Sequence, residues 1–255
     1  MCGRYASTWA RQELIEQFQV RLDAAGDAVR PDYNIAPTKQ VPAVLARPTE
    51  ESAEEAVRQL RALRWGLVPS WAKDVKIGNR LINARAETVH EKPSFRRAFA
   101  KRRCLLPADG FYEWYTPQAA EGRRPVKQPF FIRPRDGAVM AMAGLYELWR
   151  SPDDPDGEWL WTCTVITTQA ADDVGRIHDR MPMVVRPEHW DAWLDPGLTA
   201  VEEVRALLTP AMNGTMEAYP VSRAVNNVRN NGPDLIRPVT DGHMSGDRPE
   251  TGTLF

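Results

Sequence analysis

The chain has 255 residues, with 33 basic and 34 acidic side chains and a net charge of −1. This length builds one large domain or two small ones, and the near-zero charge excludes nucleic-acid binding through overall charge, so such a site requires local clustering of Lys and Arg. Its three cysteines are too far apart for a CxxC metal pair or a disulfide framework. No apolar stretch approaches the roughly 20 residues of a membrane helix. We expect a cytoplasmic monomer that contacts no membrane, with no metal site and no cofactor.

The first hundred residues combine short helices and strands. The expected elements are a helix at 8–18 capped by Ser7 or Thr8, a strand at 41–46, a strand at 60–68, and a basic helix at 95–103 capped by Ser94. Between the first two strands, residues 47–57 hold Pro48 and four glutamates. This composition indicates a solvated surface insertion, to which the sequence assigns no function.

The middle of the chain is rich in β-branched and aromatic residues separated by Asp-Gly turns. The expected strands are 104–107, 110–115, 129–133, 139–146 and 159–168, followed by helices at 188–194 and 200–208 and a strand at 217–221. Because strands and helices do not alternate regularly, we expect an α+β fold. We predict a single domain over 2–239, with a curved, mostly antiparallel sheet or barrel-like core flanked by helices. Residues 240–255 are expected to form a disordered tail.

Cys2 is the most informative single residue. Removal of Met1 leaves Cys2 with a free α-amine and a thiol on adjacent carbons. The amine condenses with an aldehyde to an imine, and the thiol then closes a five-membered thiazolidine ring. The same pair also forms an amide-cleaving nucleophile with its own base. The residue pattern alone leaves both chemistries open, along with an incidental cysteine.

Glu113 and His178 are the candidate acid and base. Glu113 shares one strand face with Phe111 and Tyr115, and burial there raises the pKa of a carboxyl group. His178 titrates near neutral pH, as proton transfer requires. Each has a purely structural alternative, since Glu113 is equally compatible with an ion pair to Arg85 or Arg180, and His178 with a polar residue at the start of a strand.

Asn83 and Arg85 stand two residues apart, so an extended segment points both in one direction. Together they offer an amide and a planar cation to a phosphate. The alternative is the entry to a helix, with Asn83 as its cap. Trp65 and Trp71 flank a glycine and a proline, and tryptophans beside a basic patch stack on unpaired bases.

Several segments together resemble the SOS-response-associated peptidase family, whose members process abasic sites. The segments are Cys2-Gly3-Arg4, Tyr33-Asn34-Ile35-Ala36-Pro37-Thr38, Trp65-Gly66-Leu67-Val68-Pro69, Asn83-Ala84-Arg85-Ala86-Glu87-Thr88, Gly110-Phe111-Tyr112-Glu113-Trp114, Ile177-His178-Asp179-Arg180-Met181-Pro182, and a late segment at 220–227. They occur in family order and cover the chain from Cys2 to about Val239. Ala72 departs from the pattern, because some members carry a second tryptophan there.

The resemblance implies an enzyme that binds single-stranded DNA containing an abasic site and captures its aldehyde as a thiazolidine crosslink. The residue matching the reactive cysteine is Cys2. Asn83 is implied to position Cys2 and the sugar, Glu113 to assist sugar-ring opening and imine chemistry, and His178 to serve as acid or base. The implied DNA contacts are Arg4, Asn34, Pro37, Trp71, Arg85 and Arg180. On DNA the protein is expected at the nucleoid.

Three other functions remain compatible with these residues. An N-terminal-nucleophile amidohydrolase also exposes a cysteine followed by glycine, and requires an oxyanion hole. A single-stranded DNA-binding module would leave Cys2 passive. The family's own description adds a self-processing peptidase that removes the residue before Cys2, an activity compatible with DNA crosslinking.

Overall fold

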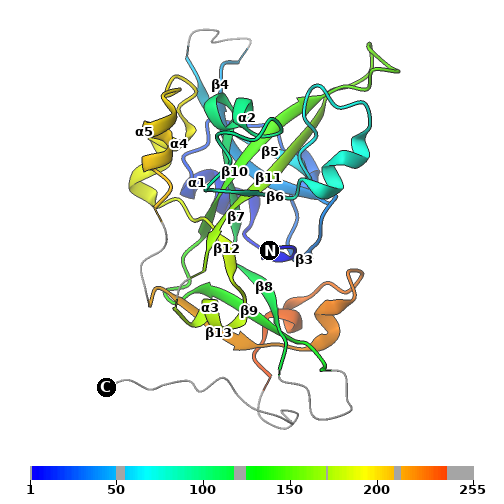
Figure 1. Ribbon diagram of the computed structural model, residues 1–255, viewed down its shortest axis with the longest axis vertical. Coiled ribbons are helices and arrows are strands. Elements are labelled where there is room, and N and C mark those ends of the chain that lie inside the picture. Colours follow the sequence, from blue (N-terminus) through cyan, green and yellow to red (C-terminus); the bar gives the residue numbers. More distant parts are fainter. Residues whose placement is uncertain (1, 50–54, 118–124, 171, 210–213, 240–255) are drawn as a thin grey trace.

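The computed structural model describes the chain except residues 1, 50–54, 118–124, 171, 210–213 and 240–255. The expected tail at 240–255 and most of the acidic part of the insertion therefore lie outside the described residues. The fold is α+β, with curved and mostly antiparallel sheets, as the sequence predicts (Figure 1). Among the described residues, no helix is long and apolar enough to cross a membrane.

Five strands close into a barrel. In order around the ring they are β5 (Val57–Trp65), β4 (Gln40–Arg47), β7 (Arg103–Ala108), β10 (Met140–Trp149) and β11 (Leu160–Gln169). Neighbouring strands are antiparallel. The ring closes where β11 runs parallel to the end of β5, at Thr162 opposite Arg64 and Cys163 opposite Trp65.

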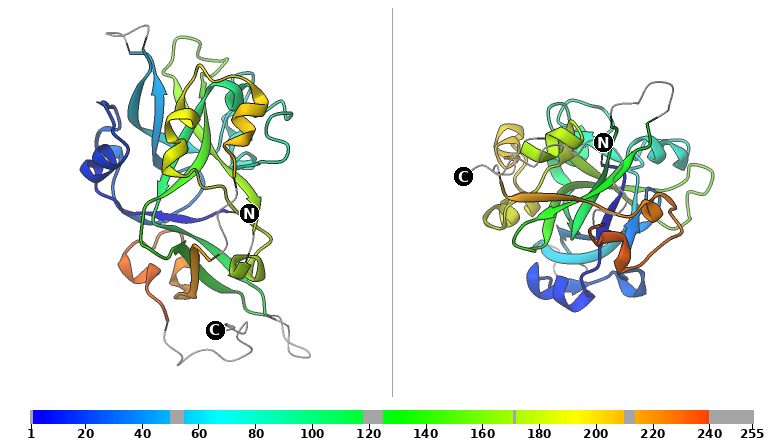
Figure 2. Two further views of the ribbon diagram at one scale, coloured as in Figure 1. Left: turned by 90° about the vertical axis from the view of Figure 1, so that its left-hand side faces the viewer. Right: turned by 90° about the horizontal axis from the view of Figure 1, so that it is seen from below.

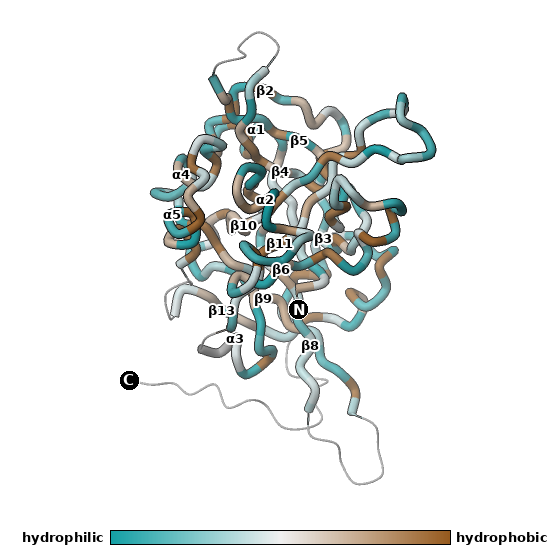
Figure 3. The backbone as a smooth tube through the Cα atoms, turned by 45° about the horizontal axis from the view of Figure 1, so that its top comes forward, coloured by the Kyte–Doolittle hydropathy of each residue, from teal (hydrophilic) through white to brown (hydrophobic). Residues whose placement is uncertain are grey.

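Alternation along each strand separates the inside of the barrel from its outside. On β10, Met140, Met142 and Tyr146 belong to the core inside the barrel, whereas Ala141 and Ala143 face a second core outside it. Four helices cover that outer core: α1 (Arg11–Gln17), α2 (Arg96–Lys101), α4 (Trp190–Leu194) and α5 (Val201–Ala206). Outlying loops are mostly hydrophilic (Figure 3).

A second sheet adjoins one open end of the barrel. Its order is β13 (Met216–Pro220), β9 (Gln128–Pro134), β8 (Gly110–Tyr115), β1 (Tyr5–Ser7) and β3 (Asp32–Ile35). A third core, which includes Tyr112, Phe131 and Val225, packs this sheet against the late segments η4 (Arg223–Asn226) and η5 (Pro233–Ile236). The dark-blue β1 runs along the junction of the two sheets (Figure 2).

The remaining elements are short. They are β2 (Leu22–Asp23), β6 (Asn83–Arg85), β12 (Arg180–Pro182), α3 (Asp172–Ile177), and the 3-10 segments η1 (Gly26–Ala28), η2 (Val75–Arg80) and η3 (Pro187–His189). The extended segment considered at Asn83 and Arg85 and the strand start considered at His178 correspond to β6 and β12, whereas the sequence predicts neither β2 nor α3. Both β6 and β12 pair with β11, which therefore links the barrel to the segments that carry Asn83 and His178.

The expected element boundaries need three corrections. Helix α1 begins at Arg11, not Thr8, because the Thr8 amide and hydroxyl are bound by the Asp109 carboxylate at 2.6 and 3.1 Å. Ser94 does not cap α2, whose N-cap is Phe95 without a side-chain bond. Strand β5 stops at Trp65 because Gly66 takes a φ of 125°, and a Cβ there would lie 2.6 Å from the Gly78 carbonyl oxygen.

Arg103 is a buried cation that joins the helices to the barrel. It is 3% exposed, and its guanidinium donates to five backbone carbonyls, those of Phe99, Ala100, Trp193, Asp195 and Leu198. Burial lowers its pKa to about 10. Carbonyls at the ends of α2 and α4 carry partial negative charge, so Arg103 satisfies both helix ends at once.

Candidate active site

Cys2 lies in the core inside the barrel, at the end that meets the second sheet. Its side chain is fully buried, in a cluster that includes Tyr5 and Trp65. The Asn83 amide donates to the Cys2 carbonyl oxygen at 2.8 Å. The pKa of the Cys2 thiol is raised far above its usual range, chiefly by burial and then by the charge of Glu113. The thiol is therefore held neutral.

Asn83 is placed by strand pairing. It lies opposite Val165 in the parallel pair of β6 with β11, so the extended conformation of this segment is confirmed and the helix-entry alternative is wrong. Its side-chain oxygen is buried and has no hydrogen-bond partner within the described part of the chain. One side chain thus fixes the Cys2 backbone and also presents a buried acceptor beside it.

Glu113 is buried on β8, with 4% of its surface exposed. The Tyr112 amide donates to the Arg4 carbonyl at 2.9 Å, which holds β8 alongside the residues that follow Cys2. Burial raises the pKa of the Glu113 carboxyl to about 7. Near neutral pH, Glu113 therefore exchanges between its acid and its base forms.

His178 follows α3 and faces Glu113. Its Nε2 lies 4.0 Å from a Glu113 carboxylate oxygen, while the Arg180 amide donates to its Nδ1 at 3.0 Å. In a neutral ring this backbone bond requires Nδ1 to accept and places the proton on Nε2, toward Glu113. Burial lowers the pKa of His178. The exposed Asp179 carboxylate, 2.9 Å from Nδ1, binds the ring when it is protonated.

The structure pairs Arg180 with a carboxylate other than Glu113, the partner that the structural alternative would give it. Its guanidinium binds Glu87 through two bonds of 2.7 and 3.0 Å, and also donates to the Thr167 carbonyl at 2.6 Å. This charge is therefore already matched within the protein. Arg85 is exposed on the neighbouring β6, with its guanidinium outside any ion pair among the described residues.

Arg4 and Asn34 form an internal brace. Arg4 donates to the Asn34 side-chain oxygen at 2.7 Å and to the Val225 carbonyl at 2.8 Å. Asn34 is fully buried and its amide binds the carbonyls of Val225, Asn227 and Asn230. Asn34 therefore does not line an exposed path for DNA as expected. Its buried side chain ties β3 to the late segment instead.

Two other expected DNA contacts lie at the surface. Trp71 is 55% exposed, and Pro37 is half-buried in the turn between β3 and β4. Ala72 is buried, and its carbonyl accepts a bond from the Trp149 indole at 2.7 Å. The sequence did not single out Trp114, which lies under the Arg4 guanidinium at 5.8 Å and donates to the Asn226 side chain. Its place in the Gly-Phe-Tyr-Glu-Trp segment was the available signal.

The fold and site together define a protein that holds a cysteine from the start of its chain beside a buried carboxylate and an imidazole. Among the described residues, no group of three or more His, Cys, Asp or Glu is arranged to hold a metal ion. The chain belongs to the SOS response associated peptidase (SRAP) family, whose model matches residues 1–228.

Named relatives agree with this assignment. The chain is 40% identical over 236 residues to the abasic site processing protein YoqW of Bacillus subtilis, covering 92% of this chain and 99% of that protein. It is 33% identical over 269 residues to the abasic site processing protein HMCES of Xenopus tropicalis, covering 94% and 78%. A solved protein from Bacteroides thetaiotaomicron shares the fold, with a TM-score of 0.77 at 24% identity, over 94% of this chain and all of that one.

Proposed function

We propose that this protein processes abasic sites in single-stranded DNA by capturing the sugar aldehyde on Cys2. The observation that carries the proposal is the convergence of Asn83, Glu113 and His178 around Cys2, in a family whose named relatives process abasic sites. Single strands suit this chemistry because a duplex would first have to be opened.

The reaction begins once Met1 has been removed. The Cys2 amine attacks the aldehyde carbon, and the resulting carbinolamine loses water to give an imine. The Cys2 sulfur then bonds to the same carbon, and the thiol proton passes to the nitrogen. The product is a thiazolidine that links protein to DNA without oxidant or cofactor. Because the buried thiol stays neutral, the amine reacts first.

Glu113 carries the proton transfers, and His178 supports it. The pKa of Glu113 is raised to about 7 by burial, so both of its forms are present at neutral pH. The ionised form accepts the proton released by the attacking amine, and the protonated form then protonates the departing hydroxyl group. The pKa of His178 is lowered by burial, so its ring is neutral, with Nδ1 bonded to the Arg180 amide and the Nε2 proton directed at the Glu113 carboxyl group.

DNA contacts in this proposal come from exposed groups. Arg85 binds a phosphate, and Trp71 with Pro37 borders the strand near the lesion. Arg4 and Arg180 act mainly by holding Cys2 and His178 in place, since both guanidiniums are already bonded within the protein. We further propose that the same cluster removes the residue before Cys2, because a neighbouring acid and base also serve amide cleavage.

The test is a denaturing gel of the protein with single-stranded DNA that carries one abasic site. We expect a heat-stable shifted band with Cys2 at the N-terminus, as checked by mass spectrometry. Cys2→Ala should retain non-covalent binding and lose the band. A residue added before Cys2 should also abolish the band if self-processing is blocked, because the α-amine becomes an amide.

Intact single-stranded DNA is the control for the lesion, and Cys163→Ala is the matched control for loss of a buried thiol. A band of equal intensity with Cys2→Ala would refute the assignment of the nucleophile. Absence of any band, together with glutamine hydrolysis, would favour the amidohydrolase alternative. Unchanged binding with no covalent product in any variant would favour the passive binding module.

A further inference from the structure

The barrel has a gap at the end opposite Cys2. Strand β5 pairs with β11 only near its end, at Arg64 and Trp65, while its first half pairs with β2 through Gln59 and Leu60. The start of β11 and the start of β5 therefore separate. A pocket of about 670 Å³ opens there, a size that accommodates a small organic ligand.

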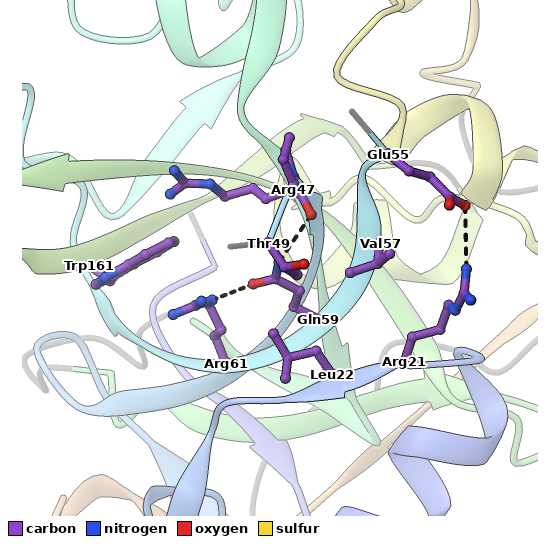
Figure 4. A pocket seen from close by; sticks show the side chains of 10 residues that line it. Arg21, Leu22, Arg47, Thr49, Glu55, Val57, Gln59, Arg61 and Trp161 are labelled. Atoms are coloured by element: carbon purple, nitrogen blue, oxygen red, sulfur yellow. Dashed lines mark hydrogen bonds and ion pairs between the residues drawn. The ribbon is translucent and has the colours of Figure 1, made fainter. Parts of the chain in front are cut away.

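Two arginines and a tryptophan form one side of this pocket. Arg47 and Arg61 lie on the inward-facing rows of β4 and β5, and their guanidinium carbons stand 5.0 and 4.2 Å from the centre of the Trp161 ring (Figure 4). Tyr146 stacks on Trp161 at 5.9 Å between ring centres. Leu22 and Val57 add apolar surface.

A buried amide holds this arrangement in place. Gln59 is 1% exposed, accepts a bond from Arg61 Nε at 2.8 Å, and donates to the Arg47 carbonyl at 3.1 Å. The terminal nitrogens of Arg61 therefore remain directed into the pocket, in the fork geometry that suits an oxyanion.

The two guanidiniums carry like charge without a counter-charge between them. Within the described part of the chain, neither Arg47 nor Arg61 forms an ion pair, whereas Arg21 at the opposite rim is bound to Glu55 at 3.3 Å. Burial and the neighbouring Arg47 lower the pKa of Arg61. An anion bound between the two arginines would relieve this repulsion.

We propose that the Arg47–Arg61–Trp161 pocket binds the phosphate of a nucleotide unit, with the planar base against the apolar and guanidinium surfaces. The phosphate is carried either by a free nucleoside monophosphate or by the 5′-end of a DNA strand. Trp161 lies four residues along β11 from Val165, which pairs with Asn83, so the pocket stands about 13 Å from that contact along the strand. It is a site separate from Cys2.

The experiment is titration calorimetry of the full chain with deoxyadenosine monophosphate, deoxyadenosine, inorganic phosphate, and a short oligonucleotide with or without a 5′-phosphate. We expect binding of the monophosphate and weaker binding of both of its parts. Arg61→Gln should reduce affinity roughly tenfold or more. Arg21→Gln removes an equal charge at the opposite rim but leaves affinity within about twofold, because Arg21 already binds Glu55.

Arg61→Lys keeps the charge without the fork, and should also weaken binding while its melting temperature shows that it folds. Preference for the free nucleotide or for the 5′-phosphorylated oligonucleotide supports the proposal and identifies the source. Equal affinity of Arg61→Gln and Arg21→Gln would overturn it, as would tight binding of deoxyadenosine alone. So would no binding of the monophosphate together with no effect of the 5′-phosphate on oligonucleotide binding. Crosslinking to abasic DNA should be unchanged in Arg61→Gln, so the two proposals fail independently.

Discussion

Replacing Glu113 with glutamine tests the electrostatic argument for the site directly. Burial raises the pKa of Glu113 from an ordinary value of 4.5 to about 7. The folded state therefore holds this proton more tightly than the unfolded state does. The resulting stability is fully present below about pH 4.5 and is lost as the pH rises through about 7. At 1.36 kcal/mol for each pH unit, the loss amounts to about 3 kcal/mol.

Glutamine has nearly the same shape and no charge to bury. Relative to wild type, Glu113→Gln should therefore become progressively more stable between pH 5 and pH 8, by up to about 3 kcal/mol. The assay is urea unfolding of both proteins at several pH values. The difference between their free energies of unfolding cancels the contributions of the other titrating groups. In the same variant, crosslinking at pH 7 should be slower, because the acid that protonates the leaving hydroxyl is gone.

Glu87→Gln is the control, because the stability that Glu87 contributes should depend on pH in the opposite direction. The hydrogen bond with Arg180 lowers the pKa of Glu87, so the stability that Glu87 contributes is present at neutral pH and lost as the pH falls. A stability difference for Glu113→Gln that stays constant from pH 5 to pH 8 would show that burial does not perturb this carboxyl. Such a result would refute the proposed acid role.

Three further outcomes are expected. Asn83→Ala removes the 2.8 Å bond to the Cys2 carbonyl. It should slow crosslinking in single-turnover gels by roughly 10-fold to 100-fold, while lowering the free energy of urea unfolding by only about 1 kcal/mol. An equal loss of rate and stability would contradict a positioning role. Arg103→Met leaves five carbonyls without their hydrogen-bond donor and should lower the free energy of urea unfolding by about 3–5 kcal/mol. The exposed Arg205→Met is the control and should lower it little. A loss under about 1 kcal/mol for Arg103→Met would contradict its role in joining the helices to the barrel. Arg85→Gln should lower the slope of log affinity against log salt by about 0.7 in fluorescence titrations with single-stranded DNA. Arg180→Gln should lower this slope less, because Glu87 already matches the charge of Arg180. Equal slopes for the two variants would contradict the assignment of the phosphate contact to Arg85.

Residue patterns predict the barrel better than they predict the junction. The strands at 104–107, 139–146 and 159–168 were located because alternation and Asp-Gly turns are local signals. Strands β1 and β3 have three or four residues each and exist through partners far along the chain, which no local pattern reveals.

The same reasoning explains which site residues were anticipated. Cys2, Glu113 and His178 stand out by their chemistry, so the sequence indicates them before any contact is known. The bond from Asn83 to Cys2, and that from Arg180 to Glu87, join segments separated by 81 and 93 positions. The burial of Asn34 likewise depends on carbonyls near residue 225, so its internal role was visible only in the folded chain.

The brace between Arg4, Asn34 and the late segment has a consequence for synthesis. The strand that follows Cys2 is among the first parts of the chain to be made, yet it is anchored by the carbonyls of Val225, Asn227 and Asn230. Those residues leave the ribosome last among the contacts that define the site. A nascent chain shorter than about 230 residues therefore carries the thiol without its final support. We expect the reactive end to mature only after residues 225–230 have left the ribosome.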